Sequence, residues 1–359
     1  MNKILIVTRH DALEKPGGDT GLLKDIQRAF SMFDCTMVAG VPKSITGYKF
    51  VFACNLDRPI EGHQLLKLCK RDSIPLHFMS LHHSSHFDIS NYLKEGLFGW
   101  KKIIAFFANY DPVNYEQILW NIRVIVNFIS RKHKLKFGSV IKAQRALIQE
   151  SEYLLVVSKE EVESIETDIG VISSKIIIFP HILPFDPYKK IKDQKNNAIF
   201  CPGRIECRKN QLFILMVAEH MPEHNFIFMG PINKSDKRFH KLFIKKSLEL
   251  KNVKVLPAQS ITDFKAFLLH SDVVLTASWF EVTSLVELDV LKRGDKLVCN
   301  SSSYNSSFFK NSLEYKANDL HDCISKINSA IKNDYILEGS YPEDNEIINS
   351  YLETINYES

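Results

Sequence analysis

Arginine, lysine and glycine lie together at one predicted bend in the second half of the sequence. Gly203 and Arg204 directly follow an apolar run, and Lys209 stands five residues after Arg204, just before a predicted helix over residues 211–219. Both cations can therefore point to one place above the end of the preceding strand, and Gly203 leaves room beside them. A planar guanidinium, a flexible ammonium and the positive end of a helix are suited to bind a diphosphate. A solvated basic turn is the alternative interpretation.

Two acidic residues follow a later apolar run in the same half. Glu281 and Asp289 are eight residues apart, and a helix that begins near Ser284 would leave Glu281 in the loop and Asp289 inside the helix. Two carboxylates so placed can bind hydroxyl groups on two parts of one elongated ligand. The backbone amides that would bind its phosphate belong to Thr283, Ser284 and Leu285. Glu287 and Asp289 are a poor pair for one metal ion, because residues i and i+2 of a helix point about 200° apart.

Two adjacent glycines, Gly17 and Gly18, precede a predicted helix over residues 21–33 in the first half. Adjacent glycines before a helix let the backbone approach a phosphate closely, and the helix dipole favours the anion. A plain turn is the alternative for these residues. Their spacing is not G-x-G-x-x-G, which disfavours a nicotinamide dinucleotide site.

Three histidines, His82, His83 and His86, follow the third predicted strand. His82 and His86 have the i, i+4 spacing of a helical metal pair, but no acid or cysteine at ligand spacing completes a tetrahedral site nearby. A histidine can also donate a hydrogen bond to a sugar hydroxyl or a phosphate oxygen. Metal binding, ligand binding and simple packing all remain open for this group.

Strand-like and helix-like patterns alternate along both halves. The predicted strands are residues 3–8, 49–54, 74–80, 153–158 and 175–179, then 198–202, 225–230, 252–257, 272–277 and 296–299. Continuous apolar strands that alternate with helices indicate parallel sheets covered on both faces. We predict an α/β fold of two Rossmann-like, doubly wound parallel-sheet domains that face each other across a cleft. The first spans 1–187, the second spans 188–342 after a polar linker, and a helix at 343–359 packs back on the first.

The composition is that of a globular protein. The chain has 359 residues, is 45% hydrophobic and carries a net charge of +4, which is too small for a general polyanion binder. No apolar stretch reaches about 18 residues and we find no signal peptide, so we expect a cytoplasmic protein. The seven cysteines form no C-x-x-C pair, which favours small buried side chains in a reducing compartment.

The two stretches CPGRIECRKNQ (201–211) and ASWFEVTSLVELDVLKRG (277–294) together resemble the retaining GT-B glycosyltransferases, and within them family 4. Weaker matches are PGGDT (16–20), SKIIIFPHI (174–182) and NVKVLPA (252–258). The order and spacing agree over nearly the whole chain. The resemblance implies the GT-B fold and a hexosyltransferase that acts on a nucleotide-sugar donor without a bound metal or other cofactor.

The resemblance also implies roles for single residues. By matching position, Arg204 and Lys209 hold the diphosphate and Glu281 binds hydroxyls of the transferred sugar, so these three are the catalytic candidates. Asp289 binds the nucleotide ribose, and one of the three histidines faces the sugar or the acceptor. The further donor-binding residues are Gly17, Gly18, Gly203, Thr283, Ser284 and Leu285.

Two departures from the family pattern concern the donor. The second acid is usually Glu, and here it is the shorter Asp289; glycines usually follow the first acid, and here Val282 and Thr283 stand there. These departures support an alternative function, in which a GT-B protein binds nucleotide or glycan without turnover and serves as a partner or chaperone subunit. An epimerase or phosphorylase is less favoured, because no acid–base group is evident near the strand ends.

The acceptor side carries aromatic and basic residues. LFGWKKIIAFFANY (97–110) mixes aromatic rings with two lysines, and residues 131–145 hold six basic residues and no acid. Such a surface suits an anionic membrane, with a lipid-linked saccharide as acceptor in surface polysaccharide or glycoconjugate assembly. The protein would then be peripheral on the inner face of the membrane. A packed helix with a solvated basic face and a soluble acceptor are the alternatives, and nucleic acid is disfavoured because the charge excess lies only in the first half.

Overall fold

The computed structural model describes residues 3–14, 17–84, 89–130, 135–183, 198–233, 236–257, 267 and 271–356. The chain forms two compact units. The first contains Met1–His86, Phe107–Phe185 and Pro342–Ser359, and the second contains Phe87–Phe106 and Asp186–Tyr341. The sequence-based boundary at 187 placed Phe87–Phe106 in the first domain, whereas these residues group with the second unit.

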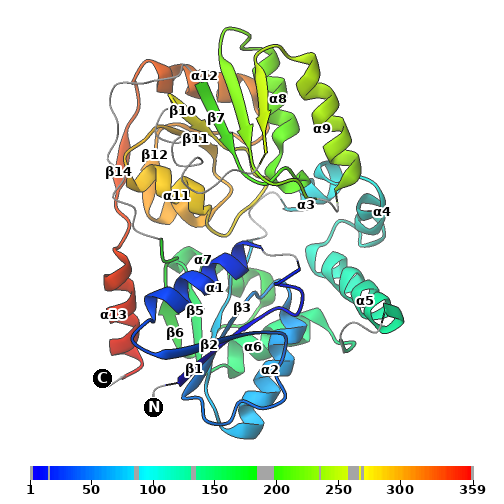
Figure 1. Ribbon diagram of the computed structural model, residues 1–359, viewed down its shortest axis with the longest axis vertical. Helices are drawn as coiled ribbons and strands as arrows, with labels where there is room; N and C mark the ends of the chain where they lie inside the picture. Colours follow the sequence, from blue (N-terminus) through cyan, green and yellow to red (C-terminus); the bar gives the residue numbers. More distant parts are fainter. Residues whose placement is uncertain are drawn as a thin grey trace. The chain divides into compact units, whose positions relative to one another are not determined.

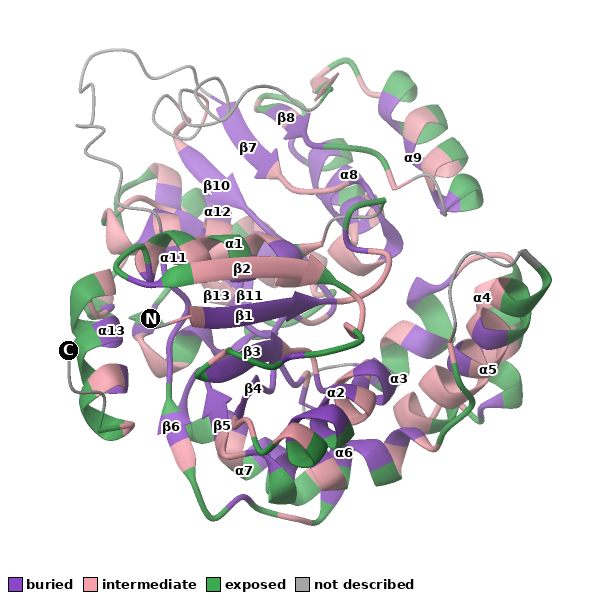
Figure 2. Cartoon of the chain, turned by 60° about the horizontal axis from the view of Figure 1, so that its bottom comes forward, coloured by how far each residue is buried: buried purple, intermediate pink, exposed green. Residues whose placement is uncertain are grey.

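The first unit is built on a six-stranded parallel sheet in the order β2-β1-β3-β4-β5-β6 (Figure 1). Its strands are β1 (Lys3–Thr8), β2 (Asp34–Ala39), β3 (Phe50–Cys54), β4 (Leu76–Met79), β5 (Tyr153–Val156) and β6 (Ile176–Ile178). Its principal helices are α1 (Gly18–Ala29), α2 (Pro59–Asp72), α5 (Pro112–Ser130), α6 (Val140–Glu150), α7 (Lys159–Ile169) and α13 (Asp344–Thr354). β1 and β3 are buried, as their purple ribbons in Figure 2 show, whereas the edge strand β2 is largely half-buried. The sheet order reverses direction between β1 and β3, which makes the carboxyl ends of these strands the switch point of this unit.

The last helix, α13, contributes to the core of the first unit. Tyr351 is 1% exposed, and its ring packs against Phe30, Phe52 and Phe179 with centroid separations of 5.6, 6.4 and 5.3 Å. The Tyr351 hydroxyl is hydrogen-bonded to Nδ1 of His77 on β4. Burial without a compensating charge lowers the pKa of His77 to about 3, so this ring is neutral in the folded protein.

The second unit is built on a parallel sheet in the order β13-β11-β10-β7-β8-β9. Its strands are β7 (Ala198–Pro202), β8 (Asn225–Met229), β9 (Val253–Leu256), β10 (Val273–Leu275), β11 (Leu297–Asn300) and β13 (Glu314–Tyr315). Its principal helices are α8 (Gln211–Glu219), α9 (Lys237–Glu249), α11 (Leu285–Lys292) and α12 (Leu320–Ile331). Counted in chain order, this is the Rossmann order, with its switch point between β7 and β10. A separate antiparallel pair joins β12 (Phe309–Asn311) to β14 (Leu337–Gly339).

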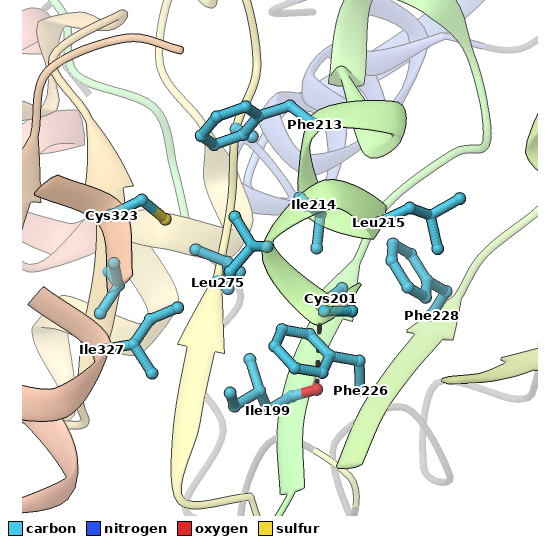
Figure 3. Packing of buried hydrophobic residues seen from close by; sticks show 14 of the residues in the cluster. Ile199, Cys201, Phe213, Ile214, Leu215, Phe226, Phe228, Leu275, Cys323 and Ile327 are labelled. Carbon is cyan, nitrogen blue, oxygen red and sulfur yellow. Dashed lines mark hydrogen bonds between the residues drawn. The ribbon is translucent and has the colours of Figure 1, made fainter. Parts of the chain in front are cut away.

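Apolar side chains from helix and sheet close the core of the second unit. Figure 3 shows α8 lying against the sheet, with Leu215 beside Phe228; Phe213 and Ile214 belong to the same cluster as Phe226 and Leu275. Cys201 and Cys323 are buried in the same cluster. Burial raises the pKa of Cys201. Five of the seven cysteines are buried, as predicted for small apolar side chains, whereas Cys35 and Cys54 are half-buried.

The segment of the second unit that precedes residue 107 is here named the crossover segment (residues 89–106). It contains α3 (Ile89–Asn91), a π-helical turn η1 (Tyr92–Gly96) and nearly all of α4 (Trp100–Phe107). Tyr92 and Phe98 pack against the core of the second unit.

The predicted doubly wound α/β architecture is confirmed in both units. The predicted linker at 186–197 and most of the predicted helix at 261–270 lie outside the described residues. Among the helices the structure describes, none combines the length and the apolar character that a membrane crossing requires.

Candidate functional site

The switch point of the second unit gathers most of the residues that the sequence singled out. β7 and β10 are paired neighbours, so the loops that follow them emerge side by side at the carboxyl edge of the sheet. The first loop carries Gly203, Arg204 and Lys209, and the second carries Glu281. Ligands of open α/β sheets bind at such a point.

The bend after β7 is fixed by its backbone. Gly203 has φ +132°, a conformation that other residues rarely adopt, and the stem of Lys209 lies beside it. The short helix η2 (Cys207–Lys209) ends at Asn210, whose φ of +53° turns the chain into α8. Gln211 Nε2 donates a hydrogen bond of 2.8 Å to the carbonyl of Arg204, which holds that half-buried residue against the start of α8.

Glu281 joins the two loops through ion pairs. Its side chain is buried; Oε1 lies against Nζ of Lys209, and Oε2 accepts a hydrogen bond of 2.6 Å from Nη1 of Arg208. Arg208 also donates to the carbonyl of Phe280 and stacks over its ring, 5.8 Å from the centroid. Burial opposes the charge of Arg208, but Glu281 and Glu206 outweigh it and raise its pKa further, so this guanidinium stays charged.

Sequence reasoning missed Arg208. The available signal was its position in the run CRK, directly before Lys209. What makes Arg208 part of the site is the loop after β10, because Glu281 on that loop binds both Arg208 and Lys209.

A small cavity of about 30 Å³ lies between the two loops and the start of α11. Its lining includes Gly203, Lys209, Thr276, Ser278 and Ser284. Ser284 precedes the first residue of α11, Leu285, and its side chain does not cap the helix. The first amides of α11 therefore keep the character of an anion-binding helix start, and Val282 and Thr283 before them are buried.

Asp289 is placed differently from Glu281. It is half-buried on α11, and its Oδ2 lies 3.1 Å from Nη2 of Arg293, one turn further along the helix. It does not belong to the set of described residues that line the cavity.

Glu287 is a second buried carboxyl at this site that sequence reasoning considered only as a metal ligand. It is 3% exposed, and it accepts hydrogen bonds from Thr276 Oγ1 at 2.7 Å and from Asn305 Nδ2 at 2.9 Å. Burial raises its pKa to about 7, more than these hydrogen bonds lower it. Glu287 and Asp289 thus bind different partners. Within the described part of the chain, no group of three or more His, Cys, Asp or Glu side chains is arranged to hold a metal ion.

The first unit holds a separate polar group, which follows β4. His82 is buried between two acids, with Nδ1 3.3 Å from Asp57 and Nε2 2.8 Å from Asp168, and His83 also binds Asp57. Burial lowers the pKa of His82, but the hydrogen bonds to the two acids outweigh it and raise the pKa to about 10. His82 therefore donates from both ring nitrogens at neutral pH. His86 lies outside the described residues.

The acids that bind these histidines could not be identified from spacing. Asp57 and Asp168 are 25 and 86 residues from His82, and only the sheet brings them together. A further acid, the fully buried Glu161 at the start of α7, accepts hydrogen bonds from Ser80 Oγ at 2.6 Å and from the amide of His82 at 2.8 Å.

The glycine loop lies at the switch point of the first unit. Gly17 precedes α1 and Gly18 is its first residue. Beside them Arg9 Nε donates a hydrogen bond of 2.6 Å to Asp19, and Arg9 lines a cavity of about 30 Å³ together with Asn55 and Arg58. Gly17 thus lies beside Arg9, which lines this cavity at the ends of β1 and β3.

Comparisons with known proteins establish the fold. The structure of HepE from Anabaena in complex with UDP and glucose matches with a TM-score of 0.60 at 13% identity, over 99% of this chain and 100% of that one. Sucrose-phosphate synthase from Thermosynechococcus elongatus matches with a TM-score of 0.64 at 10% identity, over 93% and 90%. The apo form of the lipopolysaccharide outer core galactosyltransferase WaaB matches with a TM-score of 0.56 at 12% identity, over 99% and 98%.

No protein-family model and no curated protein sequence matches this chain. At these low identities, the structural likeness supports the fold alone. The two Rossmann-like units and this likeness over nearly the full length confirm the predicted GT-B fold.

Proposed function

We propose that the protein is a retaining glycosyltransferase, which transfers a sugar from a nucleoside-diphosphate donor to a saccharide acceptor. The observation that carries this proposal is that Glu281 pairs with both Arg208 and Lys209 at the β7–β10 switch point, on the bend that also carries Arg204. Cationic side chains beside a helix start suit a diphosphate, and a carboxylate beside them suits sugar hydroxyls. The similar HepE structures are complexes with UDP, one of them with glucose as well, which supports the same ligand class here.

The ion pairs of Glu281 indicate how the donor is accommodated. In the structure Lys209 neutralises Glu281. When a diphosphate binds, the flexible Lys209 ammonium turns to the phosphate, while the planar Arg208 keeps its bond to Glu281. One carboxylate oxygen of Glu281 then becomes available to a hydroxyl of the donor sugar.

The proposed reaction needs no nucleophile from the protein. The bond between the sugar C1 and the diphosphate oxygen breaks, and the acceptor hydroxyl forms a new bond to C1 on the same face. The hydroxyl proton passes to the departing diphosphate oxygen. Arg204 and Lys209 stabilise the negative charge that develops there, which is the preorganised electrostatic contribution that usually lowers a barrier most. Because cationic side chains of the protein supply this charge, we propose that the reaction continues in EDTA.

The donor class is tested by thermal shift with UDP, GDP, dTDP and CDP. Specific stabilisation by one nucleotide identifies the base, since a ligand raises the melting temperature through its affinity for the folded state. Arg204→Ala should lose most of that shift, and Lys237→Ala on the exposed start of α9 is the matched control. An unchanged shift in Arg204→Ala contradicts the role of Arg204, and no shift with any nucleotide contradicts the proposed function.

A second candidate is a GT-B protein that binds its ligand without turnover. Val282 and Thr283, which stand where the family has glycines, are buried directly before α11, and Asp289 is paired with Arg293. A nucleotide that binds in the thermal-shift assay, combined with no transfer in a screen of donors and acceptors, would favour this alternative.

We propose in addition that the first unit binds an anionic membrane surface, where it meets a lipid-linked saccharide. The end of α5 exposes Ile125, Val126, Phe128 and Ile129, and basic residues follow in the sequence at 131–136. Apolar side chains next to basic ones suit the interface of an anionic bilayer. Sedimentation with phosphatidylglycerol vesicles tests this: Phe128→Ser should reduce binding, and Leu248→Ser, an exposed leucine of α9 in the second unit, should not.

A further inference from the structure

The crossover segment contacts the loops of the proposed donor site. The Tyr92 ring packs edge-on against Phe280 with centroids 5.1 Å apart, and lies 6.3 Å from the ring of Trp279. Gly96, one helical turn later, lies against the indole, because a Cβ at this position would come within 2.9 Å of Trp279 Nε1. The π-helical turn that holds both residues is of a kind often found at functional sites.

Trp279 and Phe280 in turn hold the diphosphate-binding bend. The amide of Trp279 donates a hydrogen bond of 2.9 Å to the carbonyl of Arg208, and the Phe280 ring lies under the Arg208 guanidinium. Arg208 binds Glu281, which also binds Lys209. One continuous set of contacts therefore runs from Tyr92 through the two aromatic residues to the bend.

A second set of contacts fixes the same segment elsewhere. Phe98 packs edge-on against Phe239 of α9 with centroids 5.7 Å apart, and Lys101 forms an ion pair with the buried Asp236. Asp236 also accepts a hydrogen bond of 3.4 Å from the amide of Cys207, the first residue of η2. The crossover segment therefore contacts the rest of the second unit at several points, and Tyr92 and Gly96 lie against the loop that carries Trp279 and Phe280.

We propose that Tyr92 is a positioning residue for the diphosphate-binding bend, and that it acts through Trp279 and Phe280 on Arg208 and Glu281. Edge-to-face rings are held at defined angles, so the ring of Tyr92 limits the orientations that Phe280 can take under the guanidinium. Tyr92 affects the geometry of Arg208 and Glu281 at the bend, and it contacts no reacting atom. The assignment of the bend to a diphosphate rests on the proposed function; the mechanical link from Tyr92 to Arg208 does not.

The test uses the full-length protein and three variants. Tyr92→Leu keeps apolar bulk and loses the ring contacts, Tyr92→Phe restores them, and Phe98→Leu is the control within the same segment. In the ligand-free protein, the rate at which phenylglyoxal modifies Arg208 is followed by peptide mass mapping. We expect about a tenfold faster modification in Tyr92→Leu, as for the loss of one aromatic contact, and wild-type rates in Tyr92→Phe and Phe98→Leu.

The ratio of the Kd values for different phosphate ligands is a second measurement, and a general loss of stability would not change it. The Kd of the nucleoside diphosphate selected by thermal shift is compared with that of its monophosphate, and inorganic pyrophosphate is the third probe. In Tyr92→Leu the diphosphate and pyrophosphate should each weaken by about tenfold while the monophosphate changes less than threefold.

The outcomes separate the two proposals. An Arg208 modification rate in Tyr92→Leu that equals the wild-type rate, or an equal rise in Phe98→Leu, overturns the positioning role of Tyr92. If the wild-type protein binds neither the nucleotides nor pyrophosphate, the proposed function fails, and the Arg208 rate still decides whether Tyr92 positions the bend.

Discussion

The bend of the second unit and the histidine group of the first unit both lie at the carboxyl ends of parallel strands, yet they carry opposite charge balances. Around the bend, Arg204, Arg208 and Lys209 exceed the acids Glu206 and Glu281. In the histidine group, acids surround the protonated ring of His82. Asp57 and Asp168 bind the ring, and the fully buried Glu161 accepts a hydrogen bond from the His82 amide. The first arrangement attracts an anion, and the second repels one.

The difference indicates that the two units, although similar in fold, suit different ligand groups. A cationic bend that carries a carboxylate can exchange an internal ion pair for a phosphate. A histidine held by two acids keeps a fixed orientation and stays protonated up to high pH, so its neighbourhood suits neutral hydroxyl groups. The predictions below test this contrast, since changes at the bend should affect catalysis and changes at the histidine group should affect stability.

The largest effect is expected from Lys209→Met. This change keeps the length of the side chain, removes the ammonium and leaves Glu281 paired with Arg208. The loss of one preorganised charge at the leaving group should lower kcat about 10²- to 10³-fold. Initial rates of donor turnover measure this, with Lys237→Met as control; a variant that keeps more than one tenth of wild-type kcat would contradict the role of Lys209.

His82→Gln should destabilise the fold strongly at neutral and acidic pH. It removes the cation from between Asp57 and Asp168, and breaking a buried ion pair from one side costs roughly 3–5 kcal/mol. Because the folded pKa of His82 is raised to about 10, the stability it contributes is complete below its ordinary value of 6.5 and is lost as the pH rises towards 10. Urea unfolding from pH 6 to pH 10 measures this, and a destabilisation that stays constant over that range would contradict it.

Glu287→Gln should stabilise the protein with a characteristic pH dependence. The folded pKa of Glu287 is raised to about 7 from 4.5, so the folded state holds a proton that the unfolded state releases, and wild-type stability falls as the pH rises through that window. Gln carries no charge, so its advantage over wild type should grow from pH 4.5 to pH 7 by up to about 3 kcal/mol and then level off. Stability is measured by urea unfolding of both proteins at several pH values. A stability difference that stays constant from pH 4.5 to pH 7 would show that Glu287 is not the responsible group.

The smallest effect is expected from Asp289→Glu. It restores the length of the family's second acid on a half-buried position of α11. If Asp289 binds the ribose, the longer side chain should change the Kd of the nucleoside diphosphate by less than about tenfold, because a single neutral hydrogen bond contributes about 1 kcal/mol. Isothermal titration of the nucleotide and of inorganic pyrophosphate separates the ribose from the phosphates, and an equal change for both ligands would argue against a ribose contact.

The sequence allowed the fold and the bend to be predicted because both are encoded locally. Gly203, Arg204 and Lys209 stand on one short turn after a strand, so their spacing alone places them together. Arg208 and Glu281 meet because β7 pairs with β10, a pairing that the strand pattern does not specify. The same holds for His82 and Asp168, which are 86 residues apart.

Two other features were missed for identifiable reasons. β2 is an edge strand with a half-buried pattern and lacks the continuous apolar run that marked its neighbours. The crossover segment precedes strands β5 and β6 of the first sheet in the chain, so nothing in its pattern indicates that Tyr92 and Phe98 pack in the second unit. Periodicity reports which face of an element is apolar, but not which partner covers it.

Each unit is built from segments that are separated in the sequence, which affects how the chain can fold during synthesis and how it can be divided into fragments. Tyr351 lies near the end of the sequence, yet its ring fills the space between Phe30, Phe52 and Phe179. During synthesis the core of the first unit therefore cannot be completed until the chain has been made as far as Tyr351, after the whole of the second unit. A fragment that stops near residue 187 would lack the tyrosine plug and would leave residues 89–106 without the surface on which they pack. A chimaera that exchanges one unit between related chains would have to include the separate segment of that unit, 342–359 for the first unit or 87–106 for the second.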